Sequence, residues 1–262
     1  MMKGYGLSWV EIRSVWGKYN TEATPEEIRR IKRLMDQYGL KCAVVDSALY
    51  KCVLPGQNSG DPKGDPYPYS GQMELLKRAM DRAQAWGTDR VRGFTFWRVK
   101  EPEKVCTQIS DELARAAAVA KSGGVRLVIE NEPACNGGTG HEVATLLKMT
   151  PSSNLGHNWD VANGYWLGEI CFPDGYESLD KSRIWHMHLK GAQCDPDTTN
   201  CRETFADEGE INLLGLFKVL LRDNYQETMS LECEFEAPGL SQQQITKRSM
   251  EGLLRVANKA VA

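Results

Sequence analysis

Four side chains that could bind a metal stand where apolar runs of the sequence end. Glu130 ends "LVIE", Asp160 ends "HNWD", His188 ends "HMH" and Glu232 lies in "SLE". A buried carboxylate at such a position is costly unless it is paired or bound to a metal. Three carboxylates and one imidazole suit Mn²⁺, Mg²⁺ or Co²⁺, and zinc is a weaker fit. These residue types predict one divalent metal ion, provided that the four runs end at one place.

The stretch "RIWHMHLKG" (183–191) raises the question of which histidine takes part. His186 and His188 are two residues apart in a predicted strand, so both side chains point to the same face. Either both are hydrogen-bonded core histidines, or one of them is a ligand at the mouth of a site. The residues alone leave both interpretations open.

The elements that must position these residues form an alternating pattern. Seven runs favour strands, at 9–14, 41–47, 89–97, 125–130, 154–161, 183–190 and 228–235. Apolar residues at i, i+3, i+4 and i+7 predict helices at 24–39, 71–87, 109–124, 213–224 and 241–260. Alternation of apolar strands with helices predicts an α/β fold with a parallel sheet, in a single domain over 1–262. In a barrel, the long stretches 49–70 and 191–210 would leave the rim at the carboxyl ends of the strands.

Composition excludes several other classes. The net charge of −3 gives no nucleic-acid or membrane surface, and no apolar run is long enough to span a bilayer. The first residues carry no apolar signal-peptide core, so a cytoplasmic location is expected. Eight cysteines occur without a C-x-x-C pair, which favours reduced thiols, although Cys194 and Cys201 flank one polar loop and could pair.

Several segments together resemble the sugar phosphate isomerase/epimerase superfamily, the xylose isomerase-like TIM barrels. They are "GLSWVEIR", "LVIENE", "LGHNWDVAN", "RIWHMHLKG", "GEINLLGLFKVL" and "SLECE", spread over nearly the whole chain. The family includes ketose 3-epimerases, hydroxypyruvate isomerase and inosose dehydratase. The resemblance implies that the metal ligands are Glu130, Asp160, His188 and Glu232, with His186 packed beneath His188.

The resemblance also implies a chemistry. A metal-dependent isomerase or epimerase would act on a small sugar, keto sugar or sugar phosphate through an enediolate, with Glu130 and Glu232 moving the carbon-bound proton. Weaker candidates for substrate contacts are Arg98, Lys190, His157 and Asn163. The alternatives are a lyase of the inosose dehydratase type, a non-catalytic sugar-binding barrel and, with less resemblance, an apurinic endonuclease. Relatives are often dimers or tetramers, so a homo-oligomer is one expectation.

The chain departs from the family pattern in four places. Glu132 stands where a histidine is frequent, Asn163 is a common variant of another histidine, and Lys190–Gly191 replaces Lys-Asp. The segment "GLSWVEIR", usually the second strand, begins already at Gly6. We therefore expect a TIM (β/α)8-type barrel that lacks its first strand and helix and has seven strands. The cytoplasmic assignment is conditional on there being no signal upstream.

Overall fold

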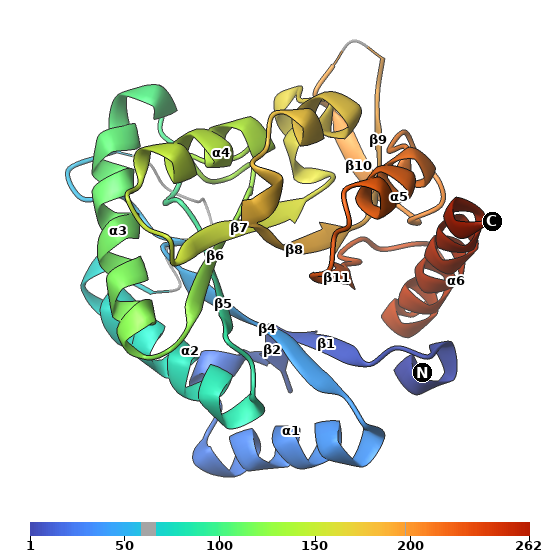
Figure 1. Ribbon diagram of the computed structural model, residues 1–262, viewed down its shortest axis with the longest axis horizontal. Coiled ribbons are helices and arrows are strands. Elements are labelled where there is room, and N and C mark those ends of the chain that lie inside the picture. Colours follow the sequence, from blue (N-terminus) through green and yellow to red (C-terminus); the bar gives the residue numbers. More distant parts are fainter. Residues whose placement is uncertain (59–66, 197) are drawn as a thin grey trace.

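A parallel sheet forms the centre of the protein in a computed structural model that describes residues 1–58, 67–196 and 198–262 (Figure 1). Within these residues, seven strands pair in the order β1–β4–β5–β6–β7–β8–β11, and all neighbours are parallel. The strands are β1 (Trp9–Ile12), β4 (Lys41–Leu49), β5 (Arg90–Gly93), β6 (Arg126–Glu130), β7 (Leu155–Asp160), β8 (Ile184–Leu189) and β11 (Thr228–Leu231). The predicted seven-stranded barrel sheet is confirmed. Residues 59–66 of the predicted loop 49–70 lie outside the described residues.

Six α-helices of the described chain surround the sheet (Figure 1). They are α1 (Pro25–Tyr38), α2 (Gln72–Trp86), α3 (Cys106–Ser122), α4 (Gly140–Met149), α5 (Leu213–Arg222) and α6 (Gln242–Val261). Five were predicted, and α4 was not. Across the described residues, no helix has both the length and the apolarity that a bilayer crossing requires.

Helix α1 shows how local sequence sets the elements. The Thr24 hydroxyl accepts a hydrogen bond from the Glu27 N–H, and the Glu27 carboxylate accepts one from the Thr24 N–H. This reciprocal cap contributes about 1 kcal/mol at such a helix start. Gly39 ends the helix with φ of 63°, a left-handed conformation that glycine adopts without strain. Helix α4 begins with the same arrangement, formed by Thr139 and Glu142.

The strands present different side chains to the two sides of the sheet. On β6, Leu127 and Ile129 pack with the helices, whereas Glu130 points to the barrel interior and is 3% exposed. Because side chains alternate along a strand, Val128 shares the inner face with Glu130. Interior positions near the carboxyl ends of the strands are polar, and this polar layer contains the candidate site.

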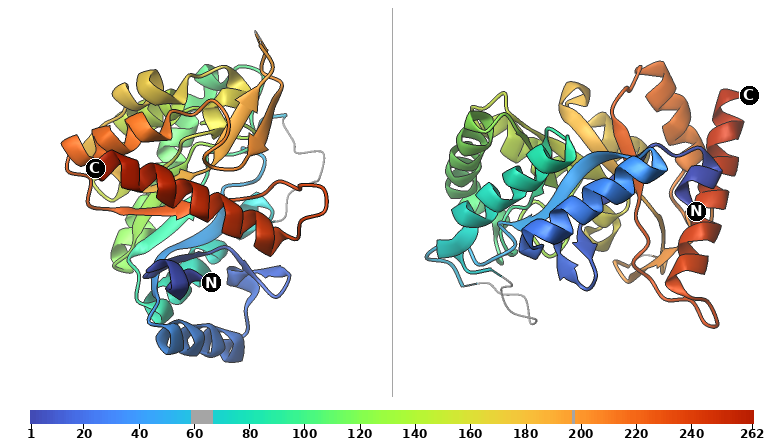
Figure 2. Two further views of the ribbon diagram at one scale, coloured as in Figure 1. Left: turned by 90° about the vertical axis from the view of Figure 1, so that its right-hand side faces the viewer. Right: turned by 90° about the horizontal axis from the view of Figure 1, so that it is seen from below.

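The first and last strands of the sheet, β1 and β11, leave a seam between them (Figure 1). A cavity of about 530 Å³ lies along this seam, and its lining includes Glu11, Arg13 and Glu232. The N-terminal turn lies beside α6 (Figure 2). The Tyr5 hydroxyl donates a 2.7 Å hydrogen bond to Glu251 of this helix. The seam therefore brings solvent to one side of the barrel interior.

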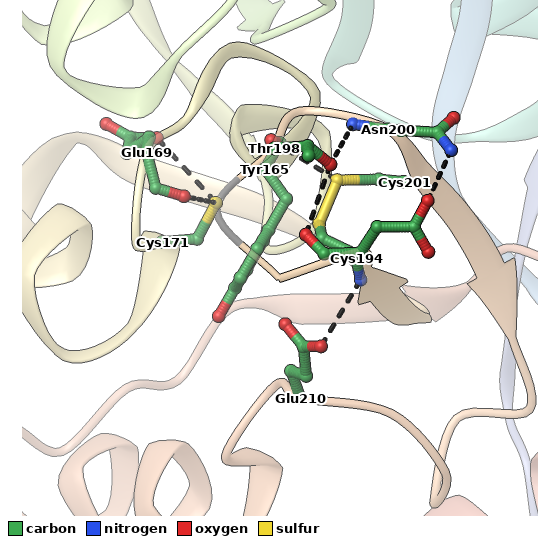
Figure 3. Close-up of a disulfide and its surroundings, with 9 residues drawn as sticks. Tyr165, Glu169, Cys171, Cys194, Thr198, Asn200, Cys201 and Glu210 are labelled. Carbon is green, nitrogen blue, oxygen red and sulfur yellow. Dashed lines mark hydrogen bonds between the residues drawn. A yellow bond between two sulfur atoms is a disulfide. The ribbon is translucent and has the colours of Figure 1, made fainter.

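The stretch after β8 is more ordered than the predicted loop. Strands β9 (Gly191–Cys194) and β10 (Cys201–Thr204) form an antiparallel hairpin, and a disulfide joins Cys194 to Cys201 (Figure 3). The two cysteines face each other directly in the ladder. The expectation of reduced thiols is therefore wrong for this pair, because the antiparallel register brings the two residues within disulfide reach. The remaining two small strands, β2 (Ser14–Val15) and β3 (Lys18–Tyr19), form a second hairpin.

Candidate metal centre

The four predicted ligands converge inside the mouth of the barrel. The Nδ1 atom of His188 lies 3.1 Å from Glu130 Oε1, 3.3 Å from Glu232 Oε2 and 3.8 Å from Asp160 Oδ2. One donor atom from each of the four residues lies within 4.8 Å of the other three. Asp160 and His188 are direct neighbours in the β7–β8 ladder, and Glu232 follows the end of β11. Parallel pairing thus brings these strand ends to one point.

The donor set fits a divalent cation. Atoms that share an ion at about 2.0–2.6 Å stand about 3–4 Å apart, and the His188 Nδ1 atom lies at such distances from the three carboxylates. Asp160 Oδ1 accepts hydrogen bonds from the N–H groups of Ala162 and Asn163, both 2.8 Å, which leaves Oδ2 directed to the cluster. Glu130, Asp160 and His188 are each no more than 3% exposed. The four residues form a buried, oxygen-rich cluster that could hold one ion.

The other side of the His188 ring is held by a carboxylate. His188 Nε2 lies 2.9 Å from Glu11 Oε1, and the second Glu11 oxygen lies 3.2 Å from His186 Nε2. An imidazole that donates its Nε2–H to a carboxylate keeps the Nδ1 lone pair for a metal. His186 makes its other contacts to Thr228 Oγ1 at 2.7 Å and Ser230 Oγ at 3.0 Å. Glu11 therefore orients both histidines, and only His188 reaches the four-residue cluster.

A buried arginine balances part of the negative charge. Arg92 Nη1 lies 2.7 Å from Glu130 Oε2 and 3.2 Å from Asp46 Oδ2. Burial tends to raise the pKa of Glu130, but the charges of Arg92 and His188 outweigh it and lower that pKa. For Asp46, burial prevails over Arg92 and raises the pKa well above its usual range. The two carboxylates that share Arg92 thus have pKa values shifted in opposite directions.

The ligands influence one another strongly. Burial opposes the charge of His188, yet the carboxylates of Glu11, Glu232 and Glu130 hold its pKa well above the usual value. In turn, His188 and Lys190 overcome burial and lower the pKa of Glu232 well below its usual value. Burial raises the pKa of Asp160 to about 6 despite the nearby Lys190. A bound cation would replace the proton on His188 and stabilise both carboxylates as anions.

Two of the four substrate-contact candidates lie beside the cluster. Lys190 Nζ lies 2.8 Å from Glu232 Oε2, 2.9 Å from Asp160 Oδ2 and 3.4 Å from Asn163 Oδ1. The Asn163 amide group also donates to the Asn131 carbonyl, which fixes its orientation. Both residues stay candidates for contacts with a bound molecule.

The other two candidates are not brought to the cluster. Arg98 forms a two-pronged ion pair with Glu142, at 2.7 and 3.0 Å, and donates to two backbone carbonyls. His157 is three residues before Asp160 and therefore occupies the opposite face of β7. It is 2% exposed, and among the described residues its Nε2 atom has no hydrogen-bond partner. Arg98 and His157 thus have surroundings typical of residues that stabilise the fold, and neither joins the four-residue cluster.

We expect His157 to make the folded protein less stable in mild acid. Burial lowers its pKa from 6.5 to about 3, so the unfolded chain takes up a proton between these values and the folded protein does not. Stability is therefore lost as pH falls from about 6.5 towards 3, and the loss at pH 5 is about 2 kcal/mol. Urea unfolding at pH 7.5 and at pH 5 measures this loss in the free energy of unfolding. The loss in His157→Gln should be about 2 kcal/mol smaller than in wild type. His141→Gln, at an exposed site, should behave as wild type; equal acid losses in all three proteins would contradict the expectation.

Sequence reasoning missed the charged residues inside the strands. Asp46 in "VVDS" and Arg92 in "RVRG" interrupt apolar runs, which is the same signal that identified Glu130. Glu11 in "WVEIR" gives the same signal. Glu132, which replaces a frequent family histidine, pairs with Lys51 at 2.9 Å instead of joining the cluster.

The fold and the cluster define a (β/α) barrel with a candidate divalent-metal site at its mouth. The sequence profile of the xylose isomerase-like TIM barrel family matches residues 2–256. The chain belongs to this family. A search of curated proteins finds no match.

Solved structures share the fold at low sequence identity. The IOLI protein with a bound zinc atom has a TM-score of 0.76 and 16% identity, covering 99% of this chain and 91% of that one. A D-tagatose 3-epimerase-like protein has a TM-score of 0.72 and 18% identity, covering 98% and 91%. The probable 3-DHS dehydratase AsbF from Bacillus anthracis has a TM-score of 0.66 and 15% identity, covering 88% and 82%. An epimerase-like protein and a probable dehydratase therefore share this scaffold.

Proposed function

We propose that the protein is a divalent-metal-dependent isomerase or epimerase of a small sugar, keto sugar or sugar phosphate. The observation that carries the proposal is the convergence of Glu130, Asp160, His188 and Glu232, with one donor atom of each within 4.8 Å of the other three. When bound, Mn²⁺, Mg²⁺ or Co²⁺ would polarise a substrate carbonyl and acidify the neighbouring C–H. Zinc, which the IOLI structure contains, is a further ion to test.

Side chains of the protein would carry out proton transfer and substrate binding. Glu232 lines the cavity and is 15% exposed at its side chain, so it is the base that a substrate carbon can reach. Glu130 approaches from the other side of the cluster, between His188 and Arg92. Removal of a proton by one carboxylate and its return by the other, from the opposite face, would invert a carbon centre. Lys190 and Asn163, which lie beside the cluster, would bind oxygens of the substrate.

The cavity is large enough for a small substrate. Its volume of about 530 Å³ lies in the range typical of ligand sites. Arg13 in its lining forms ion pairs with Glu232 and Glu234 and would be available to a substrate hydroxyl or phosphate. The proposal includes a cytoplasmic location. Disulfides are rare in cytosolic proteins, so cell fractionation should test this location against the Cys194–Cys201 disulfide.

A deuterium-exchange screen tests the proposal. We expect the Mn²⁺-loaded protein in D₂O to place deuterium on the carbon next to the carbonyl in a ketose, an inosose or hydroxypyruvate. Exchange should stop when a chelator removes the metal. Nuclear magnetic resonance measures the exchange, and mass spectrometry separates outcomes: loss of water identifies a lyase, whereas a product of unchanged formula identifies an isomerase or epimerase. Binding of a sugar without exchange would show a non-catalytic barrel and contradict the proposal.

A further inference from the structure

Lys190 places a buried ammonium on two of the four candidate ligands. It follows β8 directly and lies two residues after His188, so its side chain points to the same side of the strand. Its Nζ atom is 2.9 Å from Asp160 Oδ2 and 2.8 Å from Glu232 Oε2. The residue is 5% exposed. The ammonium is therefore an internal partner of the cluster.

The ammonium contacts the same oxygen atoms that a metal would use. Asp160 Oδ1 is occupied by two backbone N–H groups, so Oδ2 is the oxygen that remains for a cation. Glu232 Oε1 lies 3.5 Å from Arg13, whereas Oε2 faces both His188 and Lys190. The Lys190 ammonium and a bound metal would thus contact the same two oxygen atoms, Asp160 Oδ2 and Glu232 Oε2.

We propose that Lys190 is a built-in competitor of the divalent ion for Asp160 Oδ2 and Glu232 Oε2. This inference rests on the metal centre of the proposed function. Before metal binds, the ammonium offsets part of the negative charge of the two carboxylates, and an uncompensated buried charge is strongly unfavourable. After metal binds, a single and a double positive charge share the same oxygens in a poorly solvated site and repel each other. Lys190 would therefore hold the affinity for metal below that of the carboxylates alone.

The alternative role for Lys190 is to strengthen metal binding, and the two roles predict opposite changes in metal affinity. If Lys190 acted as a clamp that keeps the two carboxylates in ligand geometry, its removal would weaken metal binding. Competition predicts the reverse sign, because removal of the ammonium leaves two anionic oxygens for the metal alone. The direction of the change in metal affinity distinguishes the two roles.

The test compares Mn²⁺ binding by wild type and Lys190→Met, measured by calorimetry on metal-free protein. We expect the variant to bind Mn²⁺ at least about tenfold more tightly. Lys51→Met is the matched control: Lys51 is also paired with a carboxylate, Glu132, but contacts none of the four ligands. It removes the same charge, so its effect measures the general electrostatic contribution and should be much smaller. A Lys190→Met affinity equal to or weaker than wild type overturns the competition.

A second measurement keeps the inference testable if the variant folds poorly without metal. Lys190→Gln retains a hydrogen-bond donor without the charge and should show the same tightening. Thermal unfolding with and without Mn²⁺ should give a lower melting temperature for the metal-free variant and a larger rise on adding metal than for wild type. An equal rise in both proteins would also overturn the inference. If neither wild type nor variants bind a divalent ion, the proposed metal centre itself is wrong.

Discussion

Replacing His188 by alanine should abolish divalent-metal binding at ordinary concentrations, whereas replacing His186 should leave most of it. His188 supplies the sole imidazole nitrogen of the four-residue cluster, with Nδ1 3.1–3.8 Å from three carboxylate oxygens. Loss of an outer partner of a ligand costs about 10- to 100-fold in metal affinity, so loss of the ligand itself should exceed about 100-fold. Calorimetric titration with Mn²⁺ measures the effect.

The histidine two residues earlier is the matched control. His186 is bonded to Thr228, Ser230 and Glu11, and its ring contacts no atom of Asp160 or Glu232 among the described contacts. His186→Ala should therefore lower the free energy of unfolding by about 1–3 kcal/mol, because buried polar partners lose their bonds. Its metal affinity should fall by no more than about tenfold, through the shared Glu11. Metal binding that survives in His188→Ala but not in His186→Ala would reverse the assignment.

Much of the sheet could be predicted because its strands are buried on both sides. Apolar runs such as "RLVIE" of β6 and "KCAVVDSAL" of β4 stand out against the amphipathic helices between them. The four cluster residues were predicted from the same property, since parallel strands end at one edge. The structure brings Glu130, Asp160, His188 and Glu232 together as expected.

The remaining site contacts depend on curvature that no short segment encodes. Glu11 and His188 are 177 residues apart in sequence and belong to strands that are not neighbours in the sheet. They meet because the sheet curves until β1 approaches β8 across the barrel interior. Arg92 instead pairs with residues on the two adjacent strands, Glu130 on β6 and Asp46 on β4. A charged residue in an apolar strand indicates that a partner exists, but strand order and the curvature of the sheet select it.

The sequence contained signals for two features that were not predicted correctly, helix α4 and the orientation of His157. Helix α4 begins with "TGHE", and a threonine followed three residues later by glutamate is a helix-start pattern. His157 was considered for substrate contact although its odd separation from Asp160 places it on the other face of β7. The hairpin β9–β10 gave a weaker signal, because its polar sequence resembles a loop and its disulfide depends on the register.

The second large effect concerns proton transfer by Glu232. Glu232→Gln should lower deuterium exchange into the substrate found by the screen by about 10²- to 10⁴-fold, the usual contribution of a positioned acid or base. An amide cannot accept the carbon-bound proton, while its size and shape keep the surroundings intact. The nearby Lys190 and His188 hold the pKa of Glu232 well below its usual value, so the wild-type residue is ionised and ready to act at neutral pH.

Glu234→Gln separates this role from a general change of charge. Glu234 lies two residues further along the same segment and also pairs with Arg13, but it is 45% exposed and does not reach the cluster. Exchange in Glu234→Gln should stay within about threefold of wild type, since an exposed ion pair contributes about 0–1 kcal/mol. Calorimetry on Glu232→Gln must accompany the kinetics, because the amide also replaces a ligand oxygen. Exchange measured at saturating Mn²⁺ isolates the proton-transfer step, and exchange at the wild-type rate there would show that another group removes the proton.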